Sequence, residues 1–131
     1  MIVDSSALLA VILLEEDEDI IINAMVDAER LHMSAANWLE AAIVVDQHRS
    51  PRAAIRFEEL MEELSIEIVP VAAEIAVRAR VAHQNFGRGN HPAKLNYGDC
   101  FSYALAKTQR EPLLFKGQDF TQTDVLSALK A

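Results

Sequence analysis

Short apolar segments typical of β-strands alternate along this chain with longer segments of helical periodicity. Strands separated by helices or helix pairs favour a parallel sheet, because each connection has to cross over a face of the sheet. The sequence therefore predicts an α/β fold: a three-layer α/β/α sandwich with a mostly parallel central sheet. The predicted strands are residues 1–3, 31–34, 65–71 and 112–115, and the predicted helices are residues 7–14, 20–29, 35–49, 52–64, 72–84 and 97–110.

Length and composition set the class of protein. The chain has 131 residues, 51% hydrophobic and 24% charged, which suits one globular domain over residues 1–131. No apolar run reaches the length of a membrane span, so no membrane partner is expected. Cys100 is the only cysteine. An intrachain disulfide and a cysteine-based zinc site are thereby excluded, and a reducing, cytoplasmic location is expected.

Four acidic residues stand in apolar segments of the sequence, where an acid is not needed for folding. Asp4 ends the first strand, Glu40 interrupts the apolar helix 35–49, Asp99 lies in the first turn of helix 97–110, and Asp119 follows the last strand. A carboxylate in such surroundings is unfavourable unless it is paired or binds a cation. In parallel sheets the carboxyl ends of the strands form the ligand-binding edge, and Asp4 and Asp119 fall there directly. Glu40 and Asp99 can point at the same edge.

Four carboxylates at one edge predict a divalent metal site. Oxygen-only ligands favour Mg²⁺ or Mn²⁺ over zinc, and Mg²⁺ is commonly shared between carboxylates and a substrate phosphate. A metal-bound water supplies hydroxide near neutral pH. The pattern therefore favours hydrolysis of phosphodiesters, with Asp4, Glu40, Asp99 and Asp119 as both metal ligands and catalytic residues.

Two further residues are candidates for supporting roles. Ser6 can hydrogen-bond a carboxylate or a metal-bound water, although a helix cap at Ser5 and Ser6 explains it equally well. Asp124 lies in the ambiguous tail, residues 120–131, and a cap or turn residue is the simpler interpretation. Asp99 and Asp119 can likewise be helix caps, and Lys116 can neutralise Asp119.

Charge is unevenly distributed. The net charge of −8 argues against general coating of nucleic acid. Residues 75–98 nevertheless contain no acid. The four basic residues there, Arg78, Arg80, Arg88 and Lys94, are candidates for guiding a phosphate backbone to the acids. A solvated basic helix face and loop is the alternative interpretation.

Several segments resemble the PIN-domain ribonucleases, and in particular the VapC toxins of prokaryotic type II toxin–antitoxin modules. The resemblance rests on MIVDSSAL at residues 1–8, Glu40 in an apolar helix, NYGDCFSYALA at residues 96–106 and LLFKGQDF at residues 113–120. Residues 50–93 match only in size and helical character. The resemblance maps Asp4, Glu40, Asp99 and Asp119 onto the four acidic positions of the family, which bind Mg²⁺ or Mn²⁺, and Ser6 onto a supporting polar position.

The resemblance also implies a biology. Such proteins cut RNA endonucleolytically, often a tRNA or rRNA loop. They form homodimers and are silenced by a small cognate VapB-type antitoxin. The tail of the antitoxin wraps the toxin, and its amino-terminal part binds promoter DNA. An acidic toxin is suited to a partner that brings a basic residue. The expected dock is a groove between the first helices and helix 35–49, because the run Leu8, Leu9, Val11, Ile12, Leu13 and Leu14 carries more apolar residues than one buried face needs. A core role and a dimer contact remain alternatives for that run.

Three other functions compete. A different PIN nuclease, in RNA processing or DNA metabolism, is often longer or carries added modules. A non-catalytic α/β binding domain such as a phospho-acceptor receiver needs acids clustered differently, and only Lys116 hints at it. A haloacid-dehalogenase-type phosphatase needs Asp-x-Asp after the first strand, where this chain has Ser6.

Overall fold

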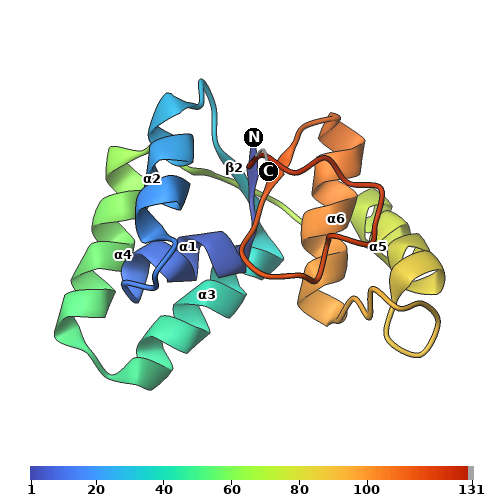
Figure 1. The fold of residues 1–131 in the computed structure, drawn as a ribbon, viewed down its shortest axis with the longest axis horizontal. Coiled ribbons are helices and arrows are strands. Elements are labelled where there is room, and N and C mark those ends of the chain that lie inside the picture. Colours follow the sequence, from blue (N-terminus) through green and yellow to red (C-terminus); the bar gives the residue numbers. More distant parts are fainter. Residues whose placement is uncertain (130–131) are drawn as a thin grey trace.

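A computed structural model describes residues 1–129. Its four strands form one sheet in the order β3-β2-β1-β4, and every neighbouring pair is parallel (Figure 1). The fold class is therefore the predicted one. The elements are β1 (Ile2–Val3), α1 (Ser5–Ile12), α2 (Glu18–Asp27), β2 (His32–Ser34), α3 (Ala35–His48), α4 (Pro51–Glu63), β3 (Glu67–Val69), α5 (Ala73–Phe86), α6 (Tyr97–Gln109) and β4 (Leu113–Leu114).

The sheet is short because its strands are only two or three residues long. The central strand β1 sets the register of its two neighbours. Ile2 of β1 pairs with His32 of β2 on one side and with Leu113 of β4 on the other. β1 is buried on both faces, as an apolar strand in a parallel sheet has to be. Its carboxyl end carries Asp4, and the carboxyl end of β4 leads to Asp119. Parallel topology thus brings residues far apart in the sequence to one edge.

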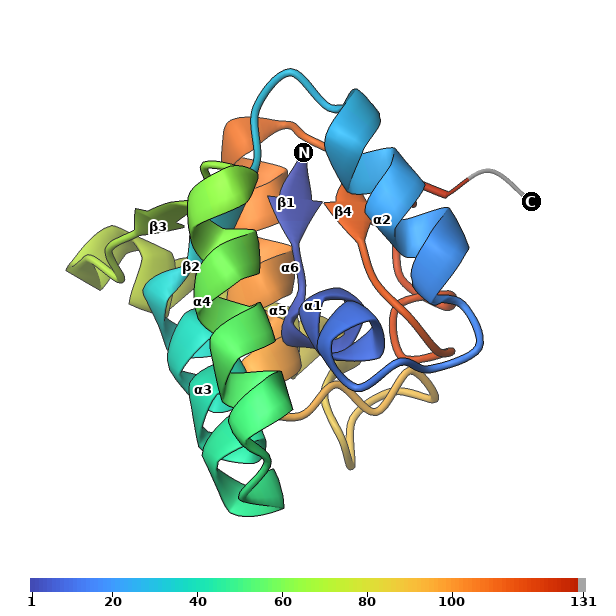
Figure 2. The same cartoon turned by 90° about the vertical axis from the view of Figure 1, so that its left-hand side faces the viewer.

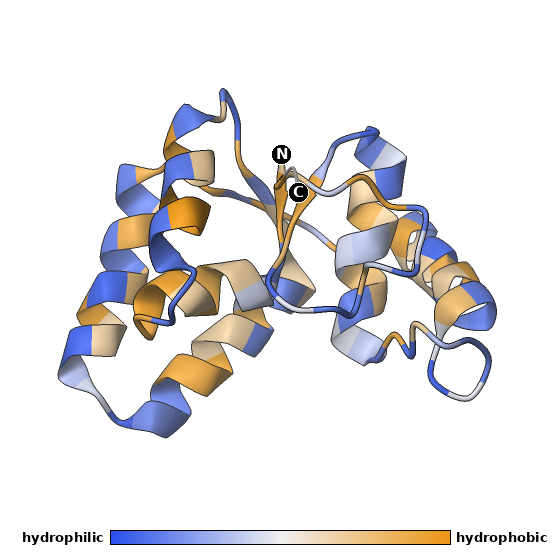
Figure 3. Cartoon of the chain, viewed as in Figure 1, coloured by the Kyte–Doolittle hydropathy of each residue, from blue (hydrophilic) through white to orange (hydrophobic). Residues whose placement is uncertain are grey.

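Helices cover both faces of the sheet. α1, α2, α4 and most of α3 pack on one face, and α5 and α6 pack on the other (Figures 1 and 2). The two faces of β1 divide accordingly, with Val3 in the first core cluster and Ile2 in the second. Figure 3 shows apolar residues on the central strands and an alternation of apolar and polar residues along the helices. Among residues 1–129, no helix is both long enough and apolar enough to cross a bilayer.

One detail differs from the sequence prediction, and two others resolve points that the sequence left open. The first helix begins at Ser5, and Asp4 rather than Ser5 or Ser6 caps it, because the Asp4 side chain accepts the Ser6 N–H. The apolar run on α1 is core: Leu8, Val11 and Ile12 are buried, Leu9 and Leu13 pack on the core, and only Leu14 of the run is exposed. The tail from residue 120 to 129 contains neither helix nor strand, although Ser127 forms a bridge to Leu113.

Candidate active site

Asp4 is the most buried of the four acids, with 3% of its surface exposed. Its Oδ2 accepts hydrogen bonds from the Ser6 N–H at 3.0 Å and from the Ser6 hydroxyl at 2.6 Å. Its Oδ1 accepts one from the fully buried Ser102 hydroxyl of α6. Burial nevertheless raises the pKa of Asp4 above its ordinary value, and the nearby charge of Glu40 adds to that rise. The hydrogen bonds therefore fix the position of the Asp4 carboxylate, while its burial and the charge of Glu40 keep its ionised form unfavourable.

Glu40 reaches the same place from the second turn of α3. Its Oε1 accepts a hydrogen bond of 2.6 Å from the Ser5 hydroxyl at the start of α1. Gly98 of α6 lies against the other oxygen: a Cβ built at Gly98 would be 2.3 Å from Glu40 Oε2. Asn37, one turn earlier on α3, donates from its side-chain amide to the Gly98 carbonyl at 2.9 Å. α1, α3 and α6 thus meet around this carboxylate.

Asp99 follows Gly98 and is held by a capping box. The Asn96 side chain accepts the Asp99 N–H at 2.9 Å, and Asp99 Oδ2 accepts the Asn96 N–H at 3.0 Å. Burial raises the pKa of Asp99 to about 7, helped by the charges of Asp4, Asp119 and Glu40 and opposed by the Asn96 hydrogen bond. Asp99 is therefore both a cap, as one interpretation of the sequence had it, and a member of an acidic cluster.

Asp119 lies on the loop that follows β4 and is exposed. The loop turns at Gly117, whose φ of +98° lies in the left-handed region that favours glycine. Phe120 anchors the loop from within the second core cluster. Asp119 is close enough to raise the pKa of Asp99, so the structure brings it to the same end of the sheet as the other three acids.

The donor set suits a hard divalent cation. Hydrogen bonds from residues 1–129 engage Oε1 of Glu40 and Oδ2 of Asp99, which leaves one oxygen of each for a ligand. Within the same residues, no three carboxylate, histidine or cysteine side chains already form a close metal-ligand group. An ion here would keep water in part of its shell, as Mg²⁺ does. The neighbouring charges that raise the pKa of Asp4 and Asp99 would be offset by such an ion.

Of the two residues predicted to have supporting roles, Ser6 contacts an acid of the site and Asp124 does not. Ser6 does more than cap: its hydroxyl donates to Asp4 and accepts the Lys116 N–H at 3.0 Å, which ties α1 to the loop after β4. Lys116 pairs with Glu15 at 2.6 Å and not with Asp119. Asp124 is engaged on the outer side of α6, where it accepts hydrogen bonds from Tyr103 and Lys107, so it stabilises the tail rather than joining the four acids.

The four basic candidates are all exposed. Arg78 and Arg80 lie on α5, and Arg88 and Lys94 lie on the loop between α5 and α6. Arg78 is paired with Glu74 at 3.4 Å, an acid just outside the basic stretch. The loop places the stretch next to the start of α6, where Asp99 lies.

Three positions around these acids were not predicted as parts of the site. Ser5 and Ser102 donate to Glu40 and Asp4, and Gly98 leaves the space that Glu40 occupies. The signal for Ser102 was a hydroxyl three residues after Asp99 in an otherwise small and apolar helix. Gly98 carried a signal too, because glycine in the first turn of a helix is unfavourable without a packing reason.

Gly98→Ala is expected to reduce catalysis strongly while the fold is retained. The new methyl would displace the Glu40 carboxylate, because the Cβ would lie within 3 Å of both Glu40 oxygens. A displacement of about 1 Å in such a site can reduce rate roughly 100-fold. The measurement is kcat/KM on an RNA substrate, with the melting temperature as the fold control. Unchanged kcat/KM would show that the position of Glu40 is not critical.

Comparisons with known proteins agree with this arrangement. The family model described as PIN domain matches residues 1–126. The chain is 47% identical to the VapC ribonuclease Mb0625 of Mycobacterium bovis over 130 residues, covering 98% of each protein. It is 42% identical to the ribonuclease VapC of Mycolicibacterium smegmatis over 125 residues, covering 95% of this chain and 97% of that protein.

Two solved structures share the fold. Mycobacterium tuberculosis VapC20, described as a sarcin–ricin loop cleaving toxin, superposes with a TM-score of 0.77 at 13% identity over 95% of each chain. A chain of a toxin–antitoxin complex from Klebsiella pneumoniae superposes with a TM-score of 0.68 at 17% identity, covering 99% of this chain and 98% of that one. At these identities the superpositions establish the architecture alone.

Proposed function

The chain belongs to the PIN-domain family, among its VapC ribonucleases, and from this premise we propose that it is the metal-dependent endoribonuclease toxin of a toxin–antitoxin pair. The observation that carries the proposal is the meeting of Asp4, Glu40, Asp99 and Asp119 at one end of the parallel sheet. Glu40 raises the pKa of Asp4, and Asp4, Glu40 and Asp119 raise the pKa of Asp99, so a cation that neutralises these charges would be bound favourably.

In the proposed mechanism the four carboxylates hold Mg²⁺ or Mn²⁺, which when bound supplies a water activated near neutral pH and offsets charge on the phosphate. Ser6 and Ser102 hold Asp4 from two sides, and Ser5 holds Glu40. These hydroxyls fix the carboxylate oxygens before substrate arrives, so little reorganisation is needed during the reaction. Asp99 is poised to lose its proton when a cation binds, because its pKa of about 7 reflects burial and repulsion.

RNA is the proposed substrate, and the basic residues are its proposed guide. Neutralising Arg78, Arg80, Arg88 and Lys94 together is expected to weaken RNA binding and to flatten its dependence on salt. Each phosphate contact to a single strand contributes about 0.7 to the slope of log K against log[salt], so removing three contacts lowers the slope by roughly 2. Three contacts are assumed because Arg78 already pairs with Glu74.

The matched control replaces Arg30, Arg49 and Arg110, which are exposed on other parts of the chain. An equal fall in slope for both sets would show that the basic stretch has no special role.

A cognate antitoxin is the proposed inhibitor, and its proposed site differs from the groove expected from the sequence. The run on α1 is core, whereas a hollow of about 290 Å³ lies between α3 and the start of α6. Its walls are apolar, with Leu39, Ile43 and Phe101, and it contains Glu40. An apolar wall beside a carboxylate suits a peptide that carries a basic side chain.

Growth tests this proposal. Induced expression of the chain is expected to arrest bacterial growth, co-expression of its neighbouring antitoxin gene to restore growth, and Asp4→Asn to leave growth unaffected. Arrest that persists in Asp4→Asn would place the toxicity outside the acidic site.

A homodimer is also proposed. Val77 and Val81, one turn apart on α5, are 63% and 47% exposed and form an apolar strip that a second copy can cover. Sedimentation of the purified protein measures this directly, and a monomer across the micromolar range would contradict it.

A further inference from the structure

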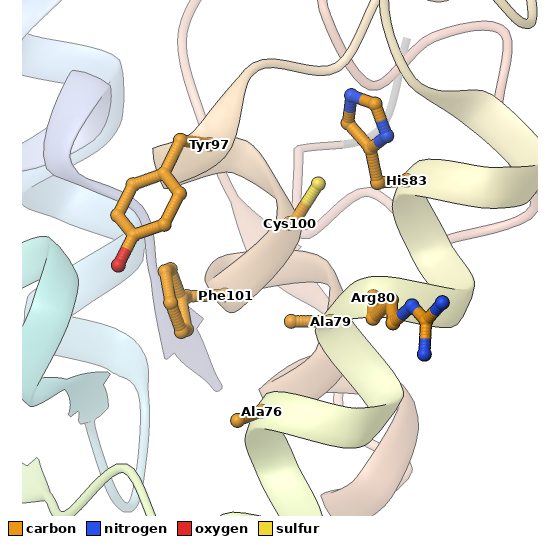
Figure 4. Close-up of a pocket in the computed structure, with 7 residues that line it drawn as sticks. All are labelled: Ala76, Ala79, Arg80, His83, Tyr97, Cys100 and Phe101. Atoms are coloured by element: carbon orange, nitrogen blue, oxygen red, sulfur yellow. The ribbon is translucent and has the colours of Figure 1, made fainter.

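A second hollow of about 290 Å³ lies between α5 and the first turn of α6 (Figure 4). Ala76, Ala79 and Phe101 form its apolar part, and Arg80, His83 and Cys100 add polar groups. Within the part of the chain that the structure describes, no carboxylate lines it. The volume lies just below the roughly 300–1,000 Å³ range of small-molecule sites, so it suits one planar group rather than a long segment.

Tyr97 forms the lip of this hollow and is 79% exposed. Its ring is held edge-on to the Phe101 ring, with centroids 4.9 Å apart and an interplanar angle of 76°. Figure 4 shows the two rings side by side on α6, with Ala76 and Ala79 directed toward them from α5. An exposed tyrosine ring contributes little to folding, so a ring fixed in this way is available to stack on a ligand.

The hollow adjoins the acidic site. Tyr97 and Phe101 also line the hollow that contains Glu40, so the two rings form a wall common to both. Gly98, where an added Cβ would meet the Glu40 carboxylate, lines the second of these hollows together with Tyr97 and Glu40. A nucleotide whose phosphate lies at the Glu40 end of the acidic site therefore has its base within reach of Tyr97.

The lining chemistry selects among occupants. Unpaired RNA bases are recognised by stacking on aromatic rings and guanidinium planes and by hydrogen bonds to their edges. Tyr97 supplies the ring and His83 supplies a polar group, whereas the Arg80 guanidinium is directed away from the two rings (Figure 4).

We propose that this hollow is a subsite for one unpaired nucleobase of the RNA, next to the phosphate held at the acids, with Tyr97 as its stacking surface. The inference rests on the ribonuclease function proposed above. It assigns Tyr97 a role in substrate selection, and it predicts that the protein distinguishes RNA that carries bases from a bare ribose-phosphate strand.

The test is binding without cleavage, in EDTA, of two fluorescent single-stranded decamers: an RNA of mixed sequence and a fully abasic ribose-phosphate strand. Wild type is expected to bind the RNA on the order of 10-fold more tightly than the abasic strand. Tyr97→Leu is expected to lose that preference, and Tyr97→Phe, which keeps the ring, to retain it. Melting temperatures of both variants serve as the fold control.

Each other outcome overturns the proposal in a recognisable way. If Tyr97→Leu keeps the preference for bases while wild type cleaves RNA, the subsite is wrong and the ribonuclease function stands. If Tyr97→Leu weakens both strands equally, or dissociates a dimer in sedimentation, the ring serves another contact. If wild type binds neither strand and cleaves no RNA, the proposed function itself fails and the subsite with it.

Discussion

Asp99→Asn is expected to reduce RNA cleavage on the order of 1,000-fold while leaving the fold intact. The substitution removes a charge from the cluster but preserves an acceptor, because the side-chain carbonyl oxygen of the new asparagine can still accept the Asn96 N–H that Asp99 Oδ2 accepts now. The measurement is kcat/KM on RNA with Mn²⁺. Asp46→Asn, which changes an exposed acid on α3, is the matched control and is expected to retain full activity.

The same variant should be more stable than wild type at high pH when metal is absent. The pKa of Asp99 is about 7 in the folded protein against an ordinary 3.8, so between these values the folded state binds more protons than the unfolded state. The contribution of Asp99 to the free energy of unfolding is therefore complete below about pH 4 and is lost as the pH rises through 7. In EDTA, the melting temperature of Asp99→Asn is therefore expected to exceed that of wild type more at pH 8 than at pH 5. The same difference at both pH values would contradict the raised pKa.

Divalent metal is expected to stabilise the protein by an amount that depends on Asp99. A cation that binds only the folded state at about 100 times its dissociation constant adds about 2.7 kcal/mol, which corresponds to roughly 5–15 °C in melting temperature. The cluster favours binding because Asp4, Glu40 and Asp119 all repel the Asp99 charge that a cation would neutralise.

Thermal melts at pH 8 with Mg²⁺, Mn²⁺ or EDTA measure this effect. Asp99→Asn is expected to lose most of the metal-induced shift. Asp124→Asn, which alters a carboxylate engaged by Tyr103 and Lys107, is expected to keep it. An equal shift in both variants would place the metal elsewhere.

Much of the fold followed from patterns that are local in sequence. β1 and β4 are apolar on both faces, and their separation by helices left a parallel sheet as the consistent topology. Asp4 and Asp119 could be assigned to one edge for the same reason, because both follow the carboxyl end of a strand. The position of each acid relative to its strand was thus readable before any tertiary contact was known.

The features that could not be predicted from the sequence depend on contacts between distant segments. The Ser102 hydroxyl reaches Asp4 across 98 residues, and Ser5 reaches Glu40 across 35. Ser5 and Ser6 were expected to cap α1, but Asp4 does so because its carboxylate accepts the Ser6 N–H. Asp124 is an acid not far beyond the last strand, yet its partners lie on the outer side of α6. Such assignments need the packing of α1, α3 and α6.

Cleavage of total cellular RNA by the purified protein, with Mg²⁺, Mn²⁺ or EDTA and beside Asp4→Asn, shows whether the acidic cluster is a metal-dependent nuclease centre. Asp4 is the most buried of the four acids and accepts three hydrogen bonds, and an asparagine in its place removes the charge while keeping one side-chain oxygen that can accept the Ser6 N–H. Discrete fragments that require both the metal and Asp4 are expected. Fragments that persist in EDTA, or that Asp4→Asn still produces, would contradict the proposed role of these carboxylates.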